Sequence, residues 1–379
     1  FDMPYDQLDR MQLRVLPLCE RQNKLAIAAD HVSLDDPPTW LSKEGWEAVV
    51  ATAERMRQAR ENGAPIMMAF GAHTIKNGLA PVLIRLMEEG WLDHLATNGA
   101  GIIHDWEFAY QGESSEDVRG YVAEGQFGIW DETGFNLNLA QAIGAFDGLG
   151  YGESVGRLIQ ADEHVLPYRR VLADALSRAG DGAEQADHAA AAADLLAVMS
   201  RFDLESGKEP VPHSWKAFSV QAAAYRLGIA FTGHPMIGHD IIYTHPANHC
   251  AAIGRTAQRD FLTFADRVSR LEGGVYLSVG SAVMSPMIFE KSLSMGQNLA
   301  MQRGEHIDNH FIMVVDLAES EWDWSEGEPP VDAPEYYLRY CKTFNRMGGE
   351  MRYTSADNRD FLLALCQELG VTGDPDLNC

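Results

Sequence analysis

Ile66-Met67-Met68-Ala69-Phe70 is a short apolar run that stands between Pro65 and Gly71. A run of this length without polar alternation is typical of a parallel strand that is buried on both faces. A small-residue loop at 71–78, a helical stretch at 79–89 and a second short strand at 94–97 follow it. Strand, loop, helix and strand in this order predict a βαβ unit, and with it an α/β protein.

The same alternation extends outward from this unit. An amphipathic helix is expected before it at 43–61, because Asn62-Gly63 supplies a helix end. In the second half, the expected helices lie at 214–227, 255–271, 286–295 and 357–369, and the expected strands at 228–232, 274–280, 311–317 and 351–354. This order predicts a doubly wound, mostly parallel sheet with helices on both faces, in which ligands bind beyond the carboxyl ends of the strands.

Two segments lie outside the regular alternation. Residues 1–40 end in Asp35-Asp36-Pro37-Pro38 and are expected to form an N-terminal arm, followed by a single domain over 41–379. Residues 179–208 are rich in Ala and Asp, and 189–199 has high helix propensity. We therefore expect a helical excursion on the surface there, which acts as a lid or an oligomer contact.

The overall composition excludes some partners. The 55 acidic and 30 basic residues give a formal charge of −25, which repels phosphate backbones, so no nucleic-acid partner is expected. The five cysteines share no CxxC spacing and favour a reducing compartment. No apolar run approaches the ~18–20 residues of a membrane helix, which predicts a cytoplasmic protein without a membrane partner.

Two loops of small residues follow the first two strands. The first spans 71–78, and the second begins at Thr97 and reaches Asp105. Backbone N–H groups in such loops can approach a pyrophosphate, although each loop could equally be a tight structural turn. Because neighbouring parallel strands end at one edge of the sheet, the two loops together predict a dinucleotide-binding crevice.

Histidines suggest further chemistry. A short span holds His234, His239, Asp240, His245, His249 and Cys250. Imidazoles with a carboxylate are metal ligands, but the spacing is not HExxH, and such histidines more often orient a cofactor or substrate. We therefore expect no metal. His73 and His104 lie on the predicted loops, where either is a candidate general base or a histidine paired to backbone.

Two acidic stretches have structural interpretations. Residues 113–117 are expected to form a helix N-cap with acids in the first turn. Residues 131–134 are expected to form a turn, whose Asp131 and Glu132 could face the pocket of a neighbouring subunit.

The order of the pieces resembles the first half of deoxyhypusine synthase. The resemblance lies in Asn77-Gly78-Leu79, the helix after it, and Thr-x-x-x-Gly before Asp105. In that family two glutamates precede this aspartate, whereas Ile103 and His104 stand here. The cofactor loop is therefore kept, while the chemistry beside it differs.

The resemblance continues to about residue 370. Gly238-His239-Asp240 is similar to a family turn, and Gly280-Ser281-Ala282-Val283 to the glycine-rich turn on the phosphate side. The acidic loop after Val314-Val315-Asp316 and the Tyr340-Cys341-Lys342 segment upstream of Ala356-Asp357 also correspond. Where the family has a polyamine-binding histidine, Ser285-Pro286-Met287 stands here.

The loops and the resemblance together imply a set of site residues. The catalytic candidates are Lys342 as a nucleophilic amine, His104 and Asp240, and the substrate candidates are Glu326 and Tyr340. Lys342 is alternatively a solvated helix lysine. The expected contacts with NAD are His73, Thr74, Asn77, Gly78, Thr97, Asn98, Gly99, Ala100, Gly101, Asp105, Gly280, Ser281, Asp316, Asp323, Ala356 and Asp357.

These observations predict an NAD-dependent transferase or oxidoreductase acting on a small amine or hydroxyl compound. The resemblance implies a homotetramer and a reaction in which NAD removes a hydride from an amine and Lys342 captures the imine. Deoxyhypusine synthesis itself is disfavoured, because the glutamate pair and the polyamine histidine are replaced. Three alternatives stay open: oxidation or elimination without lysine capture, a metal-dependent hydrolase or lyase using the 234–249 cluster, and a non-catalytic NAD-binding sensor.

Overall fold

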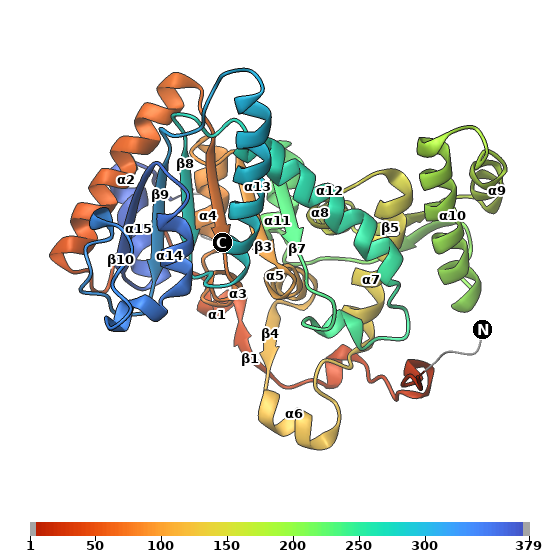
Figure 1. Cartoon of the computed structure of the whole chain (residues 1–379). Helices are drawn as coiled ribbons and strands as arrows, with labels where there is room; N and C mark the ends of the chain where they lie inside the picture. Colours follow the sequence, from red (N-terminus) through yellow and green to blue (C-terminus); the bar gives the residue numbers. More distant parts are fainter. Residues whose placement is uncertain (1–4, 374–379) are drawn as a thin grey trace.

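The central element is a six-stranded sheet with the order β10–β9–β8–β2–β3–β7, in which every neighbouring pair is parallel (Figure 1). The computed structural model describes residues 5–373. The strands are β2 (Ile66–Phe70), β3 (His94–Asn98), β7 (Ala230–His234), β8 (Val275–Val279), β9 (Phe311–Asp316) and β10 (Glu350–Ser355). The predicted parallel α/β class is confirmed.

Helices cover both faces of this sheet. Ile66, Met68 and Phe70 pack into one apolar cluster, and Met67 and Ala69 pack into another on the opposite face. The first cluster includes α2 (Lys43–Asn62), α4 (Ala80–Glu88), α5 (Gly99–Gln111), α8 (Tyr151–Ala161), α11 (Val220–Leu227) and α15 (Asn358–Leu369). The second includes α12 (Cys250–Val268), α13 (Met284–Met301) and α14 (Arg339–Asn345). Burial on both sides explains why β2 is apolar throughout.

A helical group extends from one end of the sheet, at the right of Figure 1. It consists of α7 (Asp131–Asp147), α9 (Arg169–Ser177) and α10 (Ala183–Arg201), which share a third apolar cluster. A two-stranded ribbon of β5 (Glu163–Leu166) and β6 (Gly207–Pro210) flanks it. The helix expected at 189–199 is therefore present within α10.

The N-terminal arm crosses the carboxyl edge of the sheet. Its strand β1 (Asn23–Ala26) pairs antiparallel with β4 (Glu113–Glu116). The remaining helices are α1 (Ile27–Asp30), α3 (Ala72–Lys76) and α6 (Val118–Glu124), and short 3-10 turns occur at Arg10–Gln12, Leu18–Glu20, Lys216–Phe218, Ile241–Tyr243, Trp324–Glu326 and Pro334–Tyr337. Within residues 5–373, no helix is long and apolar enough to span a membrane.

The strand order reverses between β2 and β8. From β2 the chain builds toward β3 and β7 on one side, whereas β8, β9 and β10 follow one another on the other side. The turns after β2 and β8 are in contact, because a Cβ atom on Gly71 would collide with the carbonyl oxygen of Gly280. In doubly wound sheets, such a reversal is where ligands bind.

Both predicted loops after the first strands are partly helical. Residues 72–76 form α3, and α5 begins at Gly99 directly after β3. Asn98 explains the second difference, because its Oδ1 accepts a hydrogen bond from the Gly101 N–H at 2.9 Å and so caps α5. The glycines after Asn98 therefore belong to a first helical turn.

The two acidic stretches also differ from expectation. Residues 113–116 form β4, because they pair with the arm. Asp117 alone acts as the expected cap: its carboxylate accepts a hydrogen bond from the Gly120 N–H at 3.0 Å at the start of α6. Residues 131–134 form the first turn of α7, where Asp131 and Glu132 interact favourably with the positive end of the helix dipole.

We predict that Gly71→Ala destabilises the protein by about 1–3 kcal/mol, because backbone atoms on both sides must move apart to admit the methyl group. Urea unfolding measures the loss. The matched control is Gly254→Ala, since Gly254 lies exposed in α12 with open space around it, and alanine there favours the helix. Equal stability of the two variants would contradict the prediction.

Candidate functional site

A cavity of about 190 Å³ lies at the point where the strand order reverses. We name it the switch-point cavity, and its lining residues are His73, Asn77, Gly280, Asp316, Leu317, Asp357 and Asn358. They come from the segments that follow β2, β8, β9 and β10. The fold thus brings together five of the residues expected to contact NAD, namely His73, Asn77, Gly280, Asp316 and Asp357.

Other predicted cofactor residues hold this cavity without lining it. Thr74 Oγ1 accepts from Asn358 Nδ2 at 3.3 Å, and the Ala356 N–H donates to the Asp316 carbonyl at 3.0 Å. Ser281 Oγ accepts from the Ser285 N–H at 3.2 Å near the start of α13. Gly78 has a φ of 75°, and a Cβ there would collide with the Asp30 carbonyl of the arm. These residues have structural roles.

A second cavity, also of about 190 Å³, lies beside the first turns of α5. We name it the α5 cavity, and its lining residues are Arg21, Lys76, Ala100, Ile103, His104, Glu107, Ser115, Glu116, Val118, Phe127, His239, Asp240 and Ile241. Helix α3 contributes to both cavities, since His73 lines the first and Lys76 the second. Two of the predicted catalytic residues, His104 and Asp240, therefore share one cavity, together with Ala100.

Asp240 lies against the start of α5. A Cβ atom on Gly99 would collide with the Asp240 carboxyl group, so only glycine fits there. Among the described residues, Asp240 Oδ2 is buried without a hydrogen-bond partner. This burial raises the pKa of Asp240 to about 7. The carboxyl group can therefore take up or release a proton near neutral pH.

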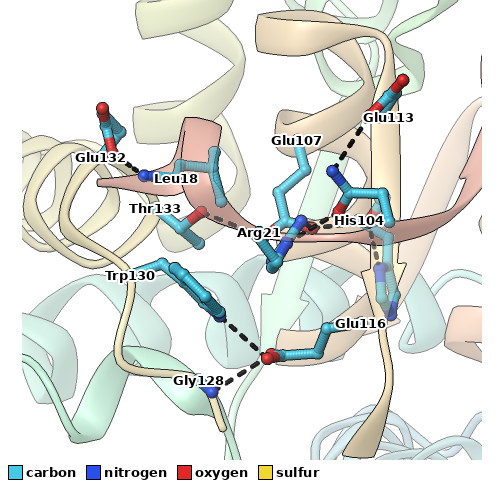
Figure 2. Close-up of polar contacts among 12 residues, drawn as sticks. Leu18, Arg21, His104, Glu107, Glu113, Glu116, Gly128, Trp130, Glu132 and Thr133 are labelled. Carbon is cyan, nitrogen blue, oxygen red and sulfur yellow. Dashed lines mark hydrogen bonds and ion pairs between the residues drawn. The ribbon is translucent and has the colours of Figure 1, made fainter. Parts of the chain in front are cut away.

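Arg21 and Glu107, which both line the α5 cavity, form a buried ion pair (Figure 2). Arg21 Nη1 and Nη2 each donate to Glu107 at 2.7 Å, and both side chains are 1% exposed. Thr133 Oγ1 donates to Glu107 Oε1 at 3.0 Å, and Ser114 Oγ donates to Oε2 at 2.5 Å. Burial raises the pKa of Glu107, but the charge and hydrogen bonds of Arg21 outweigh it, so the pKa is lowered and the carboxylate stays ionised.

His104 and Glu116 complete this network. His104 Nδ1 lies 2.7 Å from Ser114 Oγ, and burial lowers the pKa of His104 to about 4, which keeps the ring neutral. Glu116 accepts from Trp130 Nε1 at 2.8 Å and from the Gly128 N–H at 3.1 Å, and burial raises its pKa. Of the two catalytic candidates in the cavity, Asp240 is the one that titrates near neutrality.

The residues predicted around Asp105 support helices instead. Asp105 is fully buried and accepts from Ser219 Oγ at 2.6 Å and from the Val220 N–H at 2.9 Å, so it holds the start of α11. Thr97 Oγ1 donates to the Phe70 carbonyl at 2.9 Å. Neither residue lines either cavity, nor do Asn98, Gly99 or Gly101. The cofactor contacts expected of these residues remain predictions.

Asp323 and Glu326 lie beside the outer edge of β10. Asp323 caps the Trp324–Glu326 turn and lines a separate cleft with Trp322 and Tyr353. Glu326 is exposed on that turn. Both residues lie outside the two strand-end cavities.

Lys342 lies on α14 and lines neither cavity. Its Nζ lies 3.3 Å from the centre of the Tyr336 ring and 3.9 Å from Glu328 Oε2. Tyr340, on the same helix, packs with its ring centre 6.4 Å from that of Tyr353. Lys342 is buried, contrary to the solvated alternative, and its amine packs against the Tyr336 ring.

The histidines between 234 and 249 point to separate partners. His234 Nε2 lies 3.0 Å from Thr232 Oγ1, and His239 lines the α5 cavity. His245 lies 3.1 Å from Asp131, and His249 lies 3.8 Å from Asp194. Within residues 5–373, no three His, Cys, Asp or Glu side chains are grouped as metal ligands.

Arg21, Glu107 and Ser114 belong to the site but were not predicted from the sequence. The signal for Glu107 was a carboxylate between the apolar residues Trp106 and Phe108, where an unpaired charge is costly. Arg21 carried no local signal, because its partner is 86 residues away. Ser114 was assigned to a helix cap.

No protein-family model and no curated protein matches the sequence. Among solved structures, unliganded AgrE shows 14% identity and a TM-score of 0.43 over 87% of this chain and 34% of AgrE. ArgZ, an arginine dihydrolase from the ornithine-ammonia cycle in cyanobacteria, shows 14% identity and a TM-score of 0.40 over 86% of this chain and 32% of ArgZ. A presumed deoxyhypusine synthase from Entamoeba histolytica shows 10% identity and a TM-score of 0.41 over 87% of this chain and 90% of that protein.

This chain thus spans about a third of the length of AgrE and ArgZ. AgrE has been solved with ornithine and NAD+ bound. Likenesses at this level assign neither a family nor an activity to the chain, so its α/β fold rests on the parallel sheet itself.

Asp240→Asn tests the environment of the α5 cavity. A carboxyl whose folded pKa is raised from 3.8 to about 7 keeps its proton in the folded state, so the native protein loses stability as the pH rises through this window. Asp240→Asn does not lose stability in this way, because an amide does not titrate. We expect it to gain stability relative to the wild type between about pH 5 and pH 8, by no more than about 1.4 kcal/mol per pH unit.

Urea unfolding at both pH values measures this gain. The control is Asp181→Asn, which changes an exposed aspartate between α9 and α10 and should show no such trend. A stability difference between Asp240→Asn and wild type that is constant with pH would contradict the assigned burial.

Proposed function

We propose that this chain is an NAD-dependent oxidoreductase that binds the dinucleotide at the switch-point cavity and a small hydroxyl or amine substrate in the α5 cavity. The observation that carries the proposal is the convergence of five expected cofactor residues from four strand ends on one cavity. That cavity lies where the strand order reverses, which is where doubly wound sheets bind nucleotides.

The chemistry of the switch-point cavity fits the ribose part of NAD. Asp316 and Asp357 offer carboxylate oxygens that accept hydrogen bonds from ribose hydroxyls and repel a 2′-phosphate. Helix α15 begins at the same cavity, so the positive end of its dipole favours a nearby anion. The cavity volume is below the ~300–1,000 Å³ of typical ligand pockets, so the dinucleotide would extend over the open carboxyl edge of the sheet.

The α5 cavity supplies the remaining groups for an oxidation. NAD, when bound, supplies the hydride acceptor. The proton that leaves the substrate hydroxyl or amine passes to the Asp240 carboxylate, whose pKa is raised to about 7 by burial, and a carbonyl or imine product remains. Ile103, Phe127 and Ile241 give this cavity apolar walls.

Oxidation without lysine capture is preferred over imine transfer. Lys342 lines neither cavity, and its amine is held against Tyr336 and near Glu328. A nucleophilic lysine must be neutral and reach the substrate carbon. Lys342 does not meet the second requirement, because it lies outside the cavity proposed for the substrate.

NAD binding is the first test of this function. We expect NAD to stabilise the protein, by about 2.7 kcal/mol at a hundredfold excess over Kd, and NADP to bind more weakly. Asp316→Asn should weaken NAD binding roughly tenfold, because it removes a charge-assisted hydrogen bond to the ribose. Calorimetric titration measures both effects.

The matched control is Asp308→Asn, since Asp308 is an exposed aspartate before the opposite end of β9. It should leave NAD affinity unchanged. If neither NAD nor NADH stabilised the protein, the proposed function would be overturned. Equal affinity for NAD and NADP would overturn only the proposal that Asp316 and Asp357 bind the ribose hydroxyls.

Lys342→Arg separates oxidation from imine transfer. We expect the variant to keep the NAD affinity of the wild type, because Lys342 lies outside the switch-point cavity. We also expect borohydride treatment of the wild-type enzyme with NAD and spermidine to add no mass to the peptide containing Lys342. Mass spectrometry reads this result, and an adduct on Lys342 that is lost in Lys342→Arg would instead support imine transfer.

A further inference from the structure

We propose that Glu107, Ser114 and His104 form a hydrogen-bond relay that fixes His104 as the Nδ1–H tautomer and presents its Nε2 atom to the α5 cavity as a hydrogen-bond acceptor. Glu107 and Ser114 are positioning residues, and His104 is the group that meets the bound molecule. The inference rests on the proposed function only for the identity of that molecule as the substrate.

The direction of each hydrogen bond follows from the ion pair. Glu107 is ionised beside Arg21, so both of its oxygens only accept. The Ser114 hydroxyl must therefore donate its single hydrogen to Glu107 Oε2, 2.5 Å away. Ser114 Oγ is then left as an acceptor for His104, whose Nδ1 lies 2.7 Å away. The hydrogen of the neutral His104 ring is consequently on Nδ1.

The surroundings of Glu107 prevent the relay from reversing. Glu107 Oε1 accepts from Arg21 and Thr133, and Oε2 accepts from Arg21 and Ser114. Four hydrogen bonds use all the lone-pair positions of a carboxylate. Figure 2 shows Arg21 of the arm and Thr133 of α7 reaching Glu107. The Ser114 hydroxyl is thus held by a carboxylate that is itself fixed on every side.

The opposite ring nitrogen is open to the cavity. His104 lines the α5 cavity, and among residues 5–373 its Nε2 has no protein hydrogen bond and is not enclosed by protein. The charged or titratable neighbours of the ring are Glu107 on α5, Lys76 and His73 on α3, and Arg21 on the arm. Burial and the nearby positive charges lower the pKa of His104 to about 4, which keeps the Nε2 lone pair free at neutral pH.

The relay restricts the ligand of the α5 cavity. A neutral imidazole nitrogen without a hydrogen attracts an O–H or N–H group and repels a carbonyl or carboxylate oxygen. The part of the ligand that meets His104 therefore carries a hydrogen-bond donor, as a hydroxyl or amino group does. A site of this kind rejects analogues that lack the donor, because the bound analogue would cover the Nε2 acceptor and leave it unpaired.

Nitrogen-15 NMR of histidine-labelled protein tests the relay without NAD or substrate. We expect the His104 signal, assigned by its loss in His104→Asn, to show Nδ1 protonated and Nε2 unprotonated at neutral pH. Ser114→Ala should shift the ring toward the Nε2–H tautomer, because its Nδ1–H loses the acceptor, and Ser114→Thr should keep the wild-type tautomer. The His94 signal is an internal control, since its Nε2 bonds Thr232 away from the relay.

A pair of size-matched probes tests the open acceptor. We expect 2-propanol, which has an O–H donor, to shift the His104 Nε2 resonance, and acetone, which has none, to leave it unchanged. A wild-type Nε2–H tautomer, an unchanged tautomer in Ser114→Ala, or an equal response to both probes would overturn the proposal. NAD titration of Ser114→Ala, expected to match wild type, keeps a failure of the relay distinct from a failure of NAD binding.

Discussion

Parallel strand pairing imposes the constraint on which the rest of this structure depends. Six strands that run in one direction place all their carboxyl ends at one edge, and the reversal of order between β2 and β8 opens that edge at its middle. The two turns at the reversal touch through Gly71 and Gly280, where no side chain fits. Both cavities lie along this edge, so the position of the site follows from backbone geometry before any functional side chain is considered.

The ion pair between Arg21 and Glu107 is the main polar element at that edge. Removing two charges from water costs several kcal/mol per ion, and only close geometry with additional hydrogen bonds offsets this cost. The pair meets that condition, because Asn23, Ser114 and Thr133 also donate to or accept from it. A buried pair of this kind contributes more to a defined arrangement of its neighbours than to net stability. Here those neighbours are the arm, α5 and β4.

Local patterns predicted the sheet well and the site only in part. The apolar run at 66–70 matched β2 residue for residue, because burial on both faces leaves a clear signal over five positions. The residues after Asn98 were predicted as a loop because their glycines resemble one, while the capping bond of Asn98 is visible only in three dimensions. Asp105 and Arg21 show the same limit at long range, since their partners lie 114 and 86 residues away. The five cofactor candidates came together because each lies at or shortly after the carboxyl end of a strand, which is a local property.

The arm that carries Arg21 also has a consequence for the order in which the molecule assembles. Arg10 contacts Tyr243 and Asn248, Leu18 contacts Glu132, and Arg21 contacts Glu107. These partners, which anchor the arm, all lie much further along the sequence. Chains emerge from the ribosome from the amino end, and contacts distant in sequence cannot form until both partners exist. The arm is therefore synthesised before its anchors and docks after them. The part of the α5 cavity wall that Arg21 supplies therefore cannot form until Glu107 has been synthesised.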